Sequence, residues 1–538
     1  MDLSPDGLGA RTTPVVLAER AVTEPTRTCL VEAETGARIT YAELHADASA
    51  LADRLEELGV SPGSTVATML PHSIDTYRIW FALAALDAVE VPIGTRYRGR
   101  MLEHILSDST AQVLIIEAGL LHELQRSPEL TAVAARLRAV IVRGERPPGL
   151  RLGEASIIGL SELAQQGRLT SSPSPARSHR PAASDLAAVI YTSGTTGTSK
   201  GVLVPWGQVH ATAMGTFPDG TLNRDKVIYG PFPPNHIGGR LFVCLGIEYG
   251  APTVIRHVFS ASAFWTDVER YGCTTVGLVS AMAAILHQAP ATEHDAENHL
   301  AEVLMVPLVA EHRDFGVRFG VRVCTSFNMT EVSIPLVSDW SVEDWRSCGQ
   351  VRSGHPGYRV RVVDEHDQPL GPGQVGELVC RTDVPWTLNA GYLGRPDATA
   401  EAWRNGWFHT GDAFRYDDHG RFYFVDRAKD AIRRRGENVS SFEVEREVLD
   451  HPDVTGCAAI GVPSELSEED IKVFVVRRAG AEVDEAGLIA HVAAKAASFM
   501  VPRYVEFLES LPMTEGTNRV KKAELRDRER RQGAGTPS

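Results

Sequence analysis

The chain has 538 residues and a formal net charge of −15 at pH 7. At about 150 residues a domain, this length allows three or four compact units with sizeable cores. The acidic balance argues against nucleic-acid binding, which needs a basic face, and no run approaches the ~18–20 apolar residues of a membrane span. Seven widely spaced cysteines without a CxxC pair fit a reducing cytosol better than a disulfide framework or a zinc site. The first residues carry no secretory signal pattern, so we expect a cytoplasmic protein.

The N-terminal part alternates between helical and strand patterns. Residues 40–60 carry apolar residues at helical spacing, with Thr40 placed as an N-cap and Gly59 as a stop. Residues 64–70 and 88–94 are expected to be buried strands on either side of another helix. This β-α-β alternation predicts a parallel sheet with crossover helices.

Later segments change character. Residues 165–184 are rich in Ser, Pro and Arg and have few apolar anchors, which indicates a surface loop or linker. After further α/β alternation, residues 357–427 have the pattern of short antiparallel strands joined by Gly and Pro turns. Residues 430–538 have their own β-α pattern, which includes a helix at 486–500, and are long enough for a small separate domain.

The most informative segment is YTSGTTGTSKGV, which runs from Tyr191 to Val202 after an apolar strand. Its glycines let the backbone approach an anion and point N–H groups inward. Its hydroxyls add donors, and Lys200 adds a point charge suited to phosphate. The spacing is not that of the standard P-loop, and Gly/Ser/Thr runs are more often flexible loops. The preceding strand, the single lysine and the density of hydroxyls favour a phosphate-binding loop.

At this segment the chain resembles the adenylate-forming enzymes, which include acyl-CoA synthetases, luciferases and non-ribosomal adenylation domains. Three further motifs follow in the family's order: FNMTE at 327–331, GWFHTGD at 406–412 and DRAKDAIRRRGENVSSFEVE at 426–445. The resemblance covers roughly residues 30–530 and is strongest to acyl-CoA ligases of the carnitine/crotonobetaine type. It implies an α/β fold with a large N-terminal region, residues 1–426, made of two α/β subdomains plus a β-rich part at about 350–426. A small mobile α+β lid, residues 427–538, would follow.

The resemblance also implies which residues meet the nucleotide. Phe327 would stack near adenine, and Asp412 would accept the ribose hydroxyls. The residues expected to bind ATP or an acyl adenylate are Thr192, Ser193, Gly194, Thr195, Thr196, Gly197, Lys200, Phe327, Thr330, Asp412 and Arg427. Mg²⁺ would be held by Glu331 and Thr192, since such sites usually combine one carboxylate with substrate phosphates. Taken alone, Asp412 is equally a turn residue and Glu331 equally an acid at a helix start.

Four residues are expected to act in catalysis: Arg519, Lys429, Gly436 and His236. Lys429 would be the hinge of the lid, and the glycine loop at Gly436 would face the active site when CoA attacks. The arginines at 433–435 could line the CoA entrance and meet its phosphates.

The acyl group is expected to lie near His236, in the stretch FPPNHIGG, although a lone histidine is more often structural. Residues 276–286 would line the same pocket. The small residues there would leave room for a bulky acyl group, or would serve close packing instead: Gly277, Ser280, Ala281, Ala283 and Ala284.

The family's C-terminal motif carries a lysine that bridges the substrate carboxylate and the α-phosphate during adenylation. In LPMTEGTNRVKKAEL, residues 511–525, that slot falls on Arg519, or on Asn518 in the alternative alignment. Arginine keeps the positive charge, but its guanidinium group is broad and planar and is suited to bidentate contacts. Losing one well-placed electrostatic contact typically costs ~3–4 kcal/mol, or ~10²–10³ in rate. Thioester formation does not use that lysine in the family.

Three hypotheses follow. The first is a complete ligase that joins a carboxylic acid and CoA with ATP, in which Arg519 is tolerated or Lys521 or Lys522 stands in. The second is an enzyme that adenylates weakly or not at all and makes the thioester from CoA and an acyl adenylate supplied by a separate adenylating enzyme. The third is a non-catalytic adenylate-binding protein, which the retained site residues disfavour. A luciferase-like enzyme, or one that loads a separate carrier protein, is a further alternative. We favour the second hypothesis.

Overall fold

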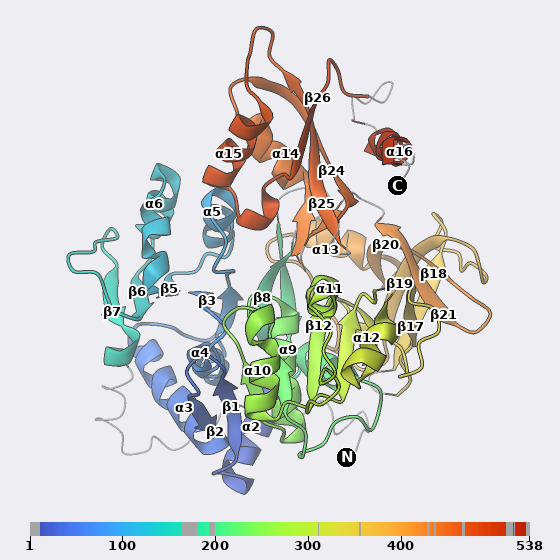
Figure 1. The fold of residues 1–538 in the computed structure, drawn as a ribbon. Helices are drawn as coiled ribbons and strands as arrows, with labels where there is room; N and C mark the ends of the chain where they lie inside the picture. Colours follow the sequence, from blue (N-terminus) through green and yellow to red (C-terminus); the bar gives the residue numbers. More distant parts are fainter. Residues whose placement is uncertain are drawn as a thin grey trace. The chain divides into compact units, whose positions relative to one another are not determined.

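The structure is a computed structural model. It describes residues 11–163, 180–192, 199–309, 311–354, 357–427, 431–434, 437–464, 468–512, 520 and 522–533. The chain divides into two compact units (Figure 1). The first comprises Met1–Thr95, Ile105–Tyr191 and Gly201–Asp426, and the second comprises Arg96–His104, Thr192–Lys200 and Arg427–Ser538.

The first unit contains a seven-stranded sheet in the order β14-β13-β12-β10-β11-β1-β2. Its strands are β1 (Thr28–Glu32), β2 (Arg38–Thr40), β10 (Ile228–Gly230), β11 (Thr253–Ile255), β12 (Thr275–Val279), β13 (Glu302–Val306) and β14 (Arg322–Cys324). All neighbours pair in parallel except β2, which closes one edge antiparallel to β1. A parallel sheet of this kind is buried on both faces, which explains its continuous apolar strands.

A second seven-stranded sheet of the same unit has the order β7-β6-β5-β3-β4-β8-β9. Its strands are β3 (Thr65–Met69), β4 (Val89–Pro92), β5 (Val113–Glu117), β6 (Ala139–Arg143), β7 (Ser156–Gly159), β8 (Leu186–Thr192) and β9 (Lys200–Pro205). β3 and β4 pair in parallel, and the helix α4 (Ile74–Ala85) connects them. The predicted β-α-β unit is therefore confirmed.

Helices pack on both faces of the first sheet (Figure 1). α2 (Thr13–Thr23), α3 (Tyr41–Glu57), α4, α8 (Trp206–Gly215) and α9 (Ile237–Tyr249) share one core with residues of both parallel sheets. α10 (Ala261–Tyr271), α11 (Ser280–Gln288) and α12 (His312–Phe319) cover the other face of the first sheet. Other described helices of the unit include η1 (Ala118–Gln125), α6 (Pro128–Ala134), α13 (Pro396–Ala402) and η2 (Arg404–Gly406). α5 (Gly99–Asp108) contributes residues to both units.

The third sheet of the first unit has the order β15-β16-β17-β21-β20-β19-β18. Its strands are β15 (Ser326–Met329), β16 (Ser333–Val337), β17 (Ser347–Val351), β18 (Tyr358–Val363), β19 (Gly376–Thr382), β20 (Phe408–Tyr416) and β21 (Arg421–Arg427). The strand pairs β15–β16, β16–β17, β17–β21, β18–β19 and β19–β20 are antiparallel. The antiparallel strands predicted for 357–427 are confirmed, and the same sheet reaches back to Ser326.

The second unit is a small α+β domain. A hairpin of β22 (Ala431–Arg434) and β23 (Glu437–Ser440) precedes the three-stranded sheet β24 (Val454–Pro463), β25 (Glu469–Arg477) and β26 (Tyr504–Phe507). Its helices are α14 (Ser441–Leu449), α15 (Glu485–Lys495), η3 (Ser498–Met500) and α16 (Lys522–Gly533). The helix predicted to reach residue 500 ends at Lys495, because Ala496 is extended, with φ −110° and ψ 167°.

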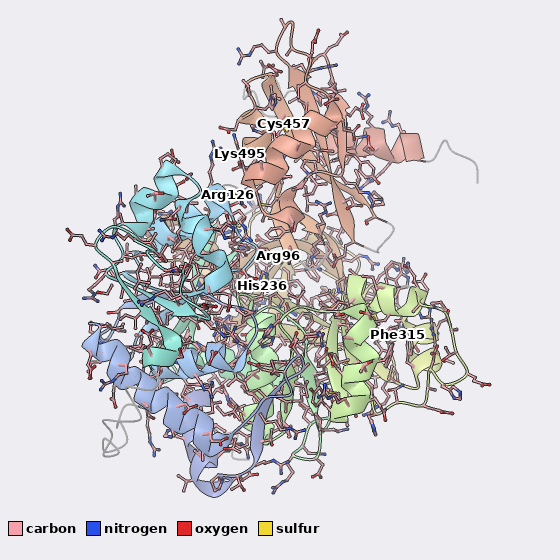
Figure 2. The ribbon with its side chains drawn as sticks, turned by 60° about the vertical axis from the view of Figure 1, so that its left-hand side comes forward. Arg96, Arg126, His236, Phe315, Cys457 and Lys495 are labelled. Atoms are coloured by element: carbon pink, nitrogen blue, oxygen red, sulfur yellow. The ribbon has the colours of Figure 1, made fainter. Side chains whose placement is uncertain are left out.

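All seven cysteines are free thiols, and six of them are buried, including Cys457 on β24 (Figure 2). No described helix combines the length and the apolar character that a membrane crossing requires.

Candidate active site

Asp412 lies where β20 departs from regular pairing. The register between β19 and β20 shifts just after Glu377, and Gly411 has a φ of +71°, a conformation that strains any residue with a Cβ. The N–H of Gly411 donates to Oε1 of Glu377 over 2.9 Å, and Oγ1 of Thr410 accepts the N–H of Asp412 over 3.2 Å. Irregular pairing of this kind re-aims a side chain and is common beside active sites. The glycine of the motif HTGD thus permits the irregular backbone that leads into Asp412, and the role of Asp412 stays a prediction.

The turn that carries Thr330 and Glu331 follows β15 and is fixed by three other residues. Gln208 of α8 donates from Nε2 to the carbonyl of Thr330 over 2.6 Å. Asn389 donates to the carbonyl of Glu331 from its backbone N–H over 3.0 Å and from its side-chain amide over 2.9 Å. The hydroxyl of Tyr392 donates to Oε1 of Glu331 over 3.3 Å. Both the backbone and the carboxylate of Glu331 are therefore held in place.

Phe327 packs beside the strand that carries Asp412. Its ring meets that of Phe414, two residues beyond Asp412, edge to face with 4.9 Å between centroids. Both rings belong to the core of the antiparallel sheet. The structure thus brings the FNMTE and HTGD motifs together, while the stacking of Phe327 near adenine stays a prediction.

The ends of the expected phosphate loop belong to two strands. Thr192 is the last residue of β8 and Lys200 the first of β9. The hydroxyl of Tyr191 donates to Oδ2 of Asp108 over 2.8 Å, and Arg395 donates to Oδ1 of the same carboxylate over 2.9 Å. Burial, followed by the hydrogen bond to Asp108, raises the pKa of Tyr191 well above its ordinary value. Tyr191 is therefore a neutral anchor for the end of β8.

Five loop residues that we expect to bind phosphate lie outside the described residues: Ser193, Gly194, Thr195, Thr196 and Gly197.

The side chains around Glu331 fit a magnesium ion. A carboxylate oxygen is the kind of ligand that Mg²⁺ takes, usually beside substrate phosphates, and the Tyr392 hydroxyl supplies the orienting partner that metal-binding carboxylates commonly have. Within the described part of the chain, no group of three or more His, Cys, Asp or Glu residues could hold a metal. The expectation that Glu331 and Thr192 hold Mg²⁺ stays a prediction.

His236 is the residue before α9 (Figure 2). Its backbone is extended, and its side chain does not cap the helix. The loop in front of it is held by Arg240, whose Nε donates to the carbonyl of Pro234 over 2.8 Å. The role of His236 beside an acyl group stays a prediction.

The small residues of β12 and α11 are already packed against neighbours. A Cβ on Gly277 would lie 2.2 Å from the ring of Phe242 and 2.9 Å from that of Phe232. Ser280 donates to the carbonyl of Pro307 over 2.6 Å, and Ala283 is fully buried. These contacts favour the close packing that the sequence left open at Gly277, and a role of these residues beside an acyl group stays a prediction.

The catalytic residues predicted for the lid are mostly outside the described part of the chain. Lys429, Gly436 and Arg519 lie beyond it, and only the backbone of Arg427 is described, as the last residue of β21. Their roles stay predictions.

One arginine of the 433–435 cluster has a structural task. Arg434 is 7% exposed, donates to the carbonyl of Phe499 over 3.2 Å and pairs with Asp470 at 3.4 Å. The expectation that the cluster meets CoA phosphates is therefore wrong for Arg434, because its charge is buried against its own domain.

The side chain of Lys522, three residues beyond Arg519 in the sequence, also has partners within its own domain. Its ammonium pairs with Oε1 of Glu445 at 2.7 Å and donates to Oγ of Ser441 over 2.7 Å. Its side chain is only 13% exposed. Since both partners belong to α14, Lys522 fastens the start of α16 to that helix.

Two family descriptions match this chain. The AMP-binding enzyme family matches residues 17–393, and the AMP-binding enzyme C-terminal domain matches residues 443–517. The chain belongs to the AMP-binding enzyme family. The resemblance to adenylate-forming enzymes that the four motifs predicted is thereby confirmed.

The relatives of this family member include CoA ligases. The chain is 30% identical over 495 residues to a crotonobetaine/carnitine–CoA ligase of Salmonella typhi, covering 90% of this chain and 92% of that protein. It is 28% identical to a fatty acyl CoA synthetase of Mycobacterium tuberculosis, with a TM-score of 0.66 over 96% of this chain and 98% of that one. An o-succinylbenzoate CoA synthetase of Bacillus subtilis has a TM-score of 0.81 at 22% identity, over 96% and 98% of the two chains. The last likeness shows the fold alone.

Proposed function

We propose that this protein is an acyl-CoA ligase-type enzyme that forms an acyl-CoA thioester from an acyl adenylate and CoA, and that it carries out the preceding adenylation weakly. Membership of the AMP-binding enzyme family and the CoA ligases among its relatives support the use of ATP and CoA. Phe327 and Asp412 would bind the nucleoside, and the phosphate loop would bind the phosphates. Glu331 would hold Mg²⁺, which when bound neutralises part of the phosphate charge.

The structural observation that supports weak adenylation is that Lys522 is already bound to Glu445 and Ser441. Adenylation sets a carboxylate against an anionic triphosphate, so a compact cation has to stand between them. By sequence the lysine slot holds Arg519, whose fork is sized for bidentate contacts. Lys522 is held by Glu445 and Ser441, and removing it would leave a mostly buried Glu445 without this cation, which is costly. One of the two lysines that could replace the family's lysine is therefore in use elsewhere.

The thioester step does not require a cation at the position of the family's lysine. The CoA sulfur attacks the acyl carbonyl carbon, the bond from that carbon to the phosphate oxygen breaks, and AMP leaves with the electron pair while the thiol proton is released. Lys429 and Gly436 would serve this step as the hinge and the facing loop. The acyl adenylate would come from a separate adenylating enzyme.

The first prediction separates the two half-reactions. We expect the wild-type protein with ATP, Mg²⁺ and a panel of acids to exchange pyrophosphate weakly, and to make thioester readily from a preformed acyl adenylate and CoA. Arg519→Lys should raise exchange by about tenfold or more, because one well-placed charge is typically worth ~10²–10³ in rate, and should leave thioester formation unchanged. Arg530→Lys is the control, since Arg530 is 76% exposed on α16.

Three outcomes would contradict this prediction. Robust exchange by the wild-type protein would favour a complete ligase. An unchanged rate in Arg519→Lys would place the lysine slot elsewhere. Loss of exchange in Lys522→Ala with thioester formation retained would show that Lys522 acts in adenylation despite its pairing with Glu445.

A further inference from the structure

A short segment of the chain, Asn389–Leu393, runs along the strand that leaves the phosphate loop. The N–H of Leu203 on β9 donates to the carbonyl of Gly391 over 2.9 Å, and the N–H of Ala390 donates to the carbonyl of Leu203 over 2.9 Å. The N–H of Leu393 donates to the carbonyl of Gly201 over 2.8 Å. Asn389–Leu393, which we call the strap, is thus bonded to β9 as a short antiparallel partner.

The strap also forms hydrogen bonds with Glu331. Asn389 is 4% exposed, and its amide and backbone N–H both donate to the carbonyl of Glu331. The Oδ1 of Asn389 in turn accepts the indole N–H of Trp403 over 3.2 Å. Tyr392 then reaches the Glu331 carboxylate with its hydroxyl. One segment of five residues therefore connects the strand after the phosphate loop to the carboxylate expected to hold the metal.

The backbone of the strap admits little variation. Gly391 has a φ of +113°, and a Cβ there would lie 2.6 Å from Cγ2 of Thr399. Oγ1 of Thr399 accepts the N–H of Tyr392 over 3.0 Å. These contacts fix the position of Tyr392, so its hydroxyl is presented to Glu331 by a rigid backbone.

We propose that Tyr392 is a positioning residue that orients the Glu331 carboxylate toward the metal–nucleotide complex. The inference rests on the proposed function, since it assumes that Glu331 holds Mg²⁺. Partners that orient metal-binding carboxylates are typically worth 10–100-fold in metal affinity. Tyr392 would act through its hydrogen bond to Glu331.

The test measures metal binding directly in the full-length protein. Mn²⁺ replaces Mg²⁺ as the probe, and free Mn²⁺ is followed by electron paramagnetic resonance at saturating ATP. We expect Tyr392→Phe to weaken Mn²⁺ binding by about 10–100-fold, while ATP binding in the absence of metal is unchanged. Tyr416→Phe is the matched control, because it also removes one tyrosine hydroxyl bond, from β20 of the antiparallel sheet to the carbonyl of Leu370.

A double-mutant cycle distinguishes positioning from a general loss of structure. If Tyr392 acts through Glu331, the double variant Tyr392→Phe/Glu331→Gln should bind Mn²⁺ no more weakly than Glu331→Gln alone. Should Tyr392→Phe fail to fold, Asn389→Ser tests the other end of the strap, and wild-type Mn²⁺ affinity in that variant would overturn the inference.

The remaining outcomes separate the inference from the proposed function. Equal Mn²⁺ affinity in wild type, Tyr392→Phe and Tyr416→Phe would overturn the role of Tyr392 and leave the proposed function standing. A wild-type protein that binds neither ATP nor AMP would overturn the proposed function, and with it the inference. Additive losses in the double-mutant cycle would make Tyr392 a structural residue only.

Discussion

His72 shows how far a single buried residue departs from its behaviour in water. It is fully buried, and its Nε2 lies 2.7 Å from the hydroxyl of Tyr77. Burial, followed by the positive charge of Arg240, lowers its pKa to about 3. The imidazole is therefore neutral in the folded protein at any pH near neutrality, although the unfolded chain would protonate it below about pH 6.5.

This difference predicts a pH dependence of stability. Between pH 6.5 and pH 3 the unfolded state binds more protons at His72 than the folded state, so stability falls as the pH falls. By pH 5 the loss from this residue is ~2 kcal/mol. In His72→Gln that part of the pH dependence should vanish, which urea unfolding of the first unit at pH 7 and pH 5 would measure. His366→Gln, which replaces a histidine 77% exposed, should keep the wild-type slope; an equal slope in both variants would contradict the prediction.

At the scale of elements, α3 has the most complete local signal in the chain. Oγ1 of Thr40 accepts the N–H of Glu43 over 3.2 Å, and the Glu43 carboxylate accepts the N–H of Thr40 over 2.9 Å. This reciprocal pair is the capping box. Beyond the other end of the helix, Gly59 has a φ of +81°. The N-cap and the stop that the sequence predicts are both confirmed.

The capping box gives the prediction at this scale. Thr40→Ala removes the acceptor for Glu43 and should lower the free energy of unfolding by about 1 kcal/mol. Thr23→Ala is the control, because Thr23 is exposed and its hydroxyl donates to the carbonyl of Glu19 within its own helix. Thermal or urea unfolding would compare the two, and an equal effect in both variants would argue against the cap.

For the molecule as a whole, the first unit contains a buried ion pair that links the helix α9 to the strand β4 of the second parallel sheet. Arg240, 1% exposed on α9, pairs with Glu90 on β4 at 2.6 Å. Its guanidinium carbon also lies 4.5 Å from the ring centre of Trp80, and Thr68 donates to the same carboxylate. The pair also fixes the loop before His236 through Pro234. The loop before His236, an expected acyl-site residue, is thus tied to a contact between a helix and a sheet.

Breaking this pair should be costly. Glu90→Gln leaves the Arg240 charge buried without a carboxylate, and we expect a loss of ~3–5 kcal/mol in the free energy of unfolding. Asp383→Asn is the control, because the Arg359–Asp383 pair is 54% and 52% exposed and such pairs contribute ~0–1 kcal/mol. Urea unfolding would measure both. A loss below 1 kcal/mol in Glu90→Gln would show that water reaches the pair.

The sequence by itself determined the features whose signals are local. The cap at Thr40, the β-α-β unit around α4 and the glycine of HTGD each act within a few residues, and the four motifs were sufficient to place the chain in its family. These signals depend on helix periodicity, backbone conformation and the order of motifs, all of which are written in the sequence.

Only the tertiary structure decided which distant residues meet. Tyr392 and Glu331 are 61 residues apart, and Arg240 and Glu90 are 150 apart. Asn389 and Gly391 could have been marked as a turn, but nothing in a single sequence aims Tyr392 at Glu331 or fills the space at Gly277 with Phe242. Such partnerships follow from the order of strands in the sheets, because strand order brings together side chains that no local rule connects.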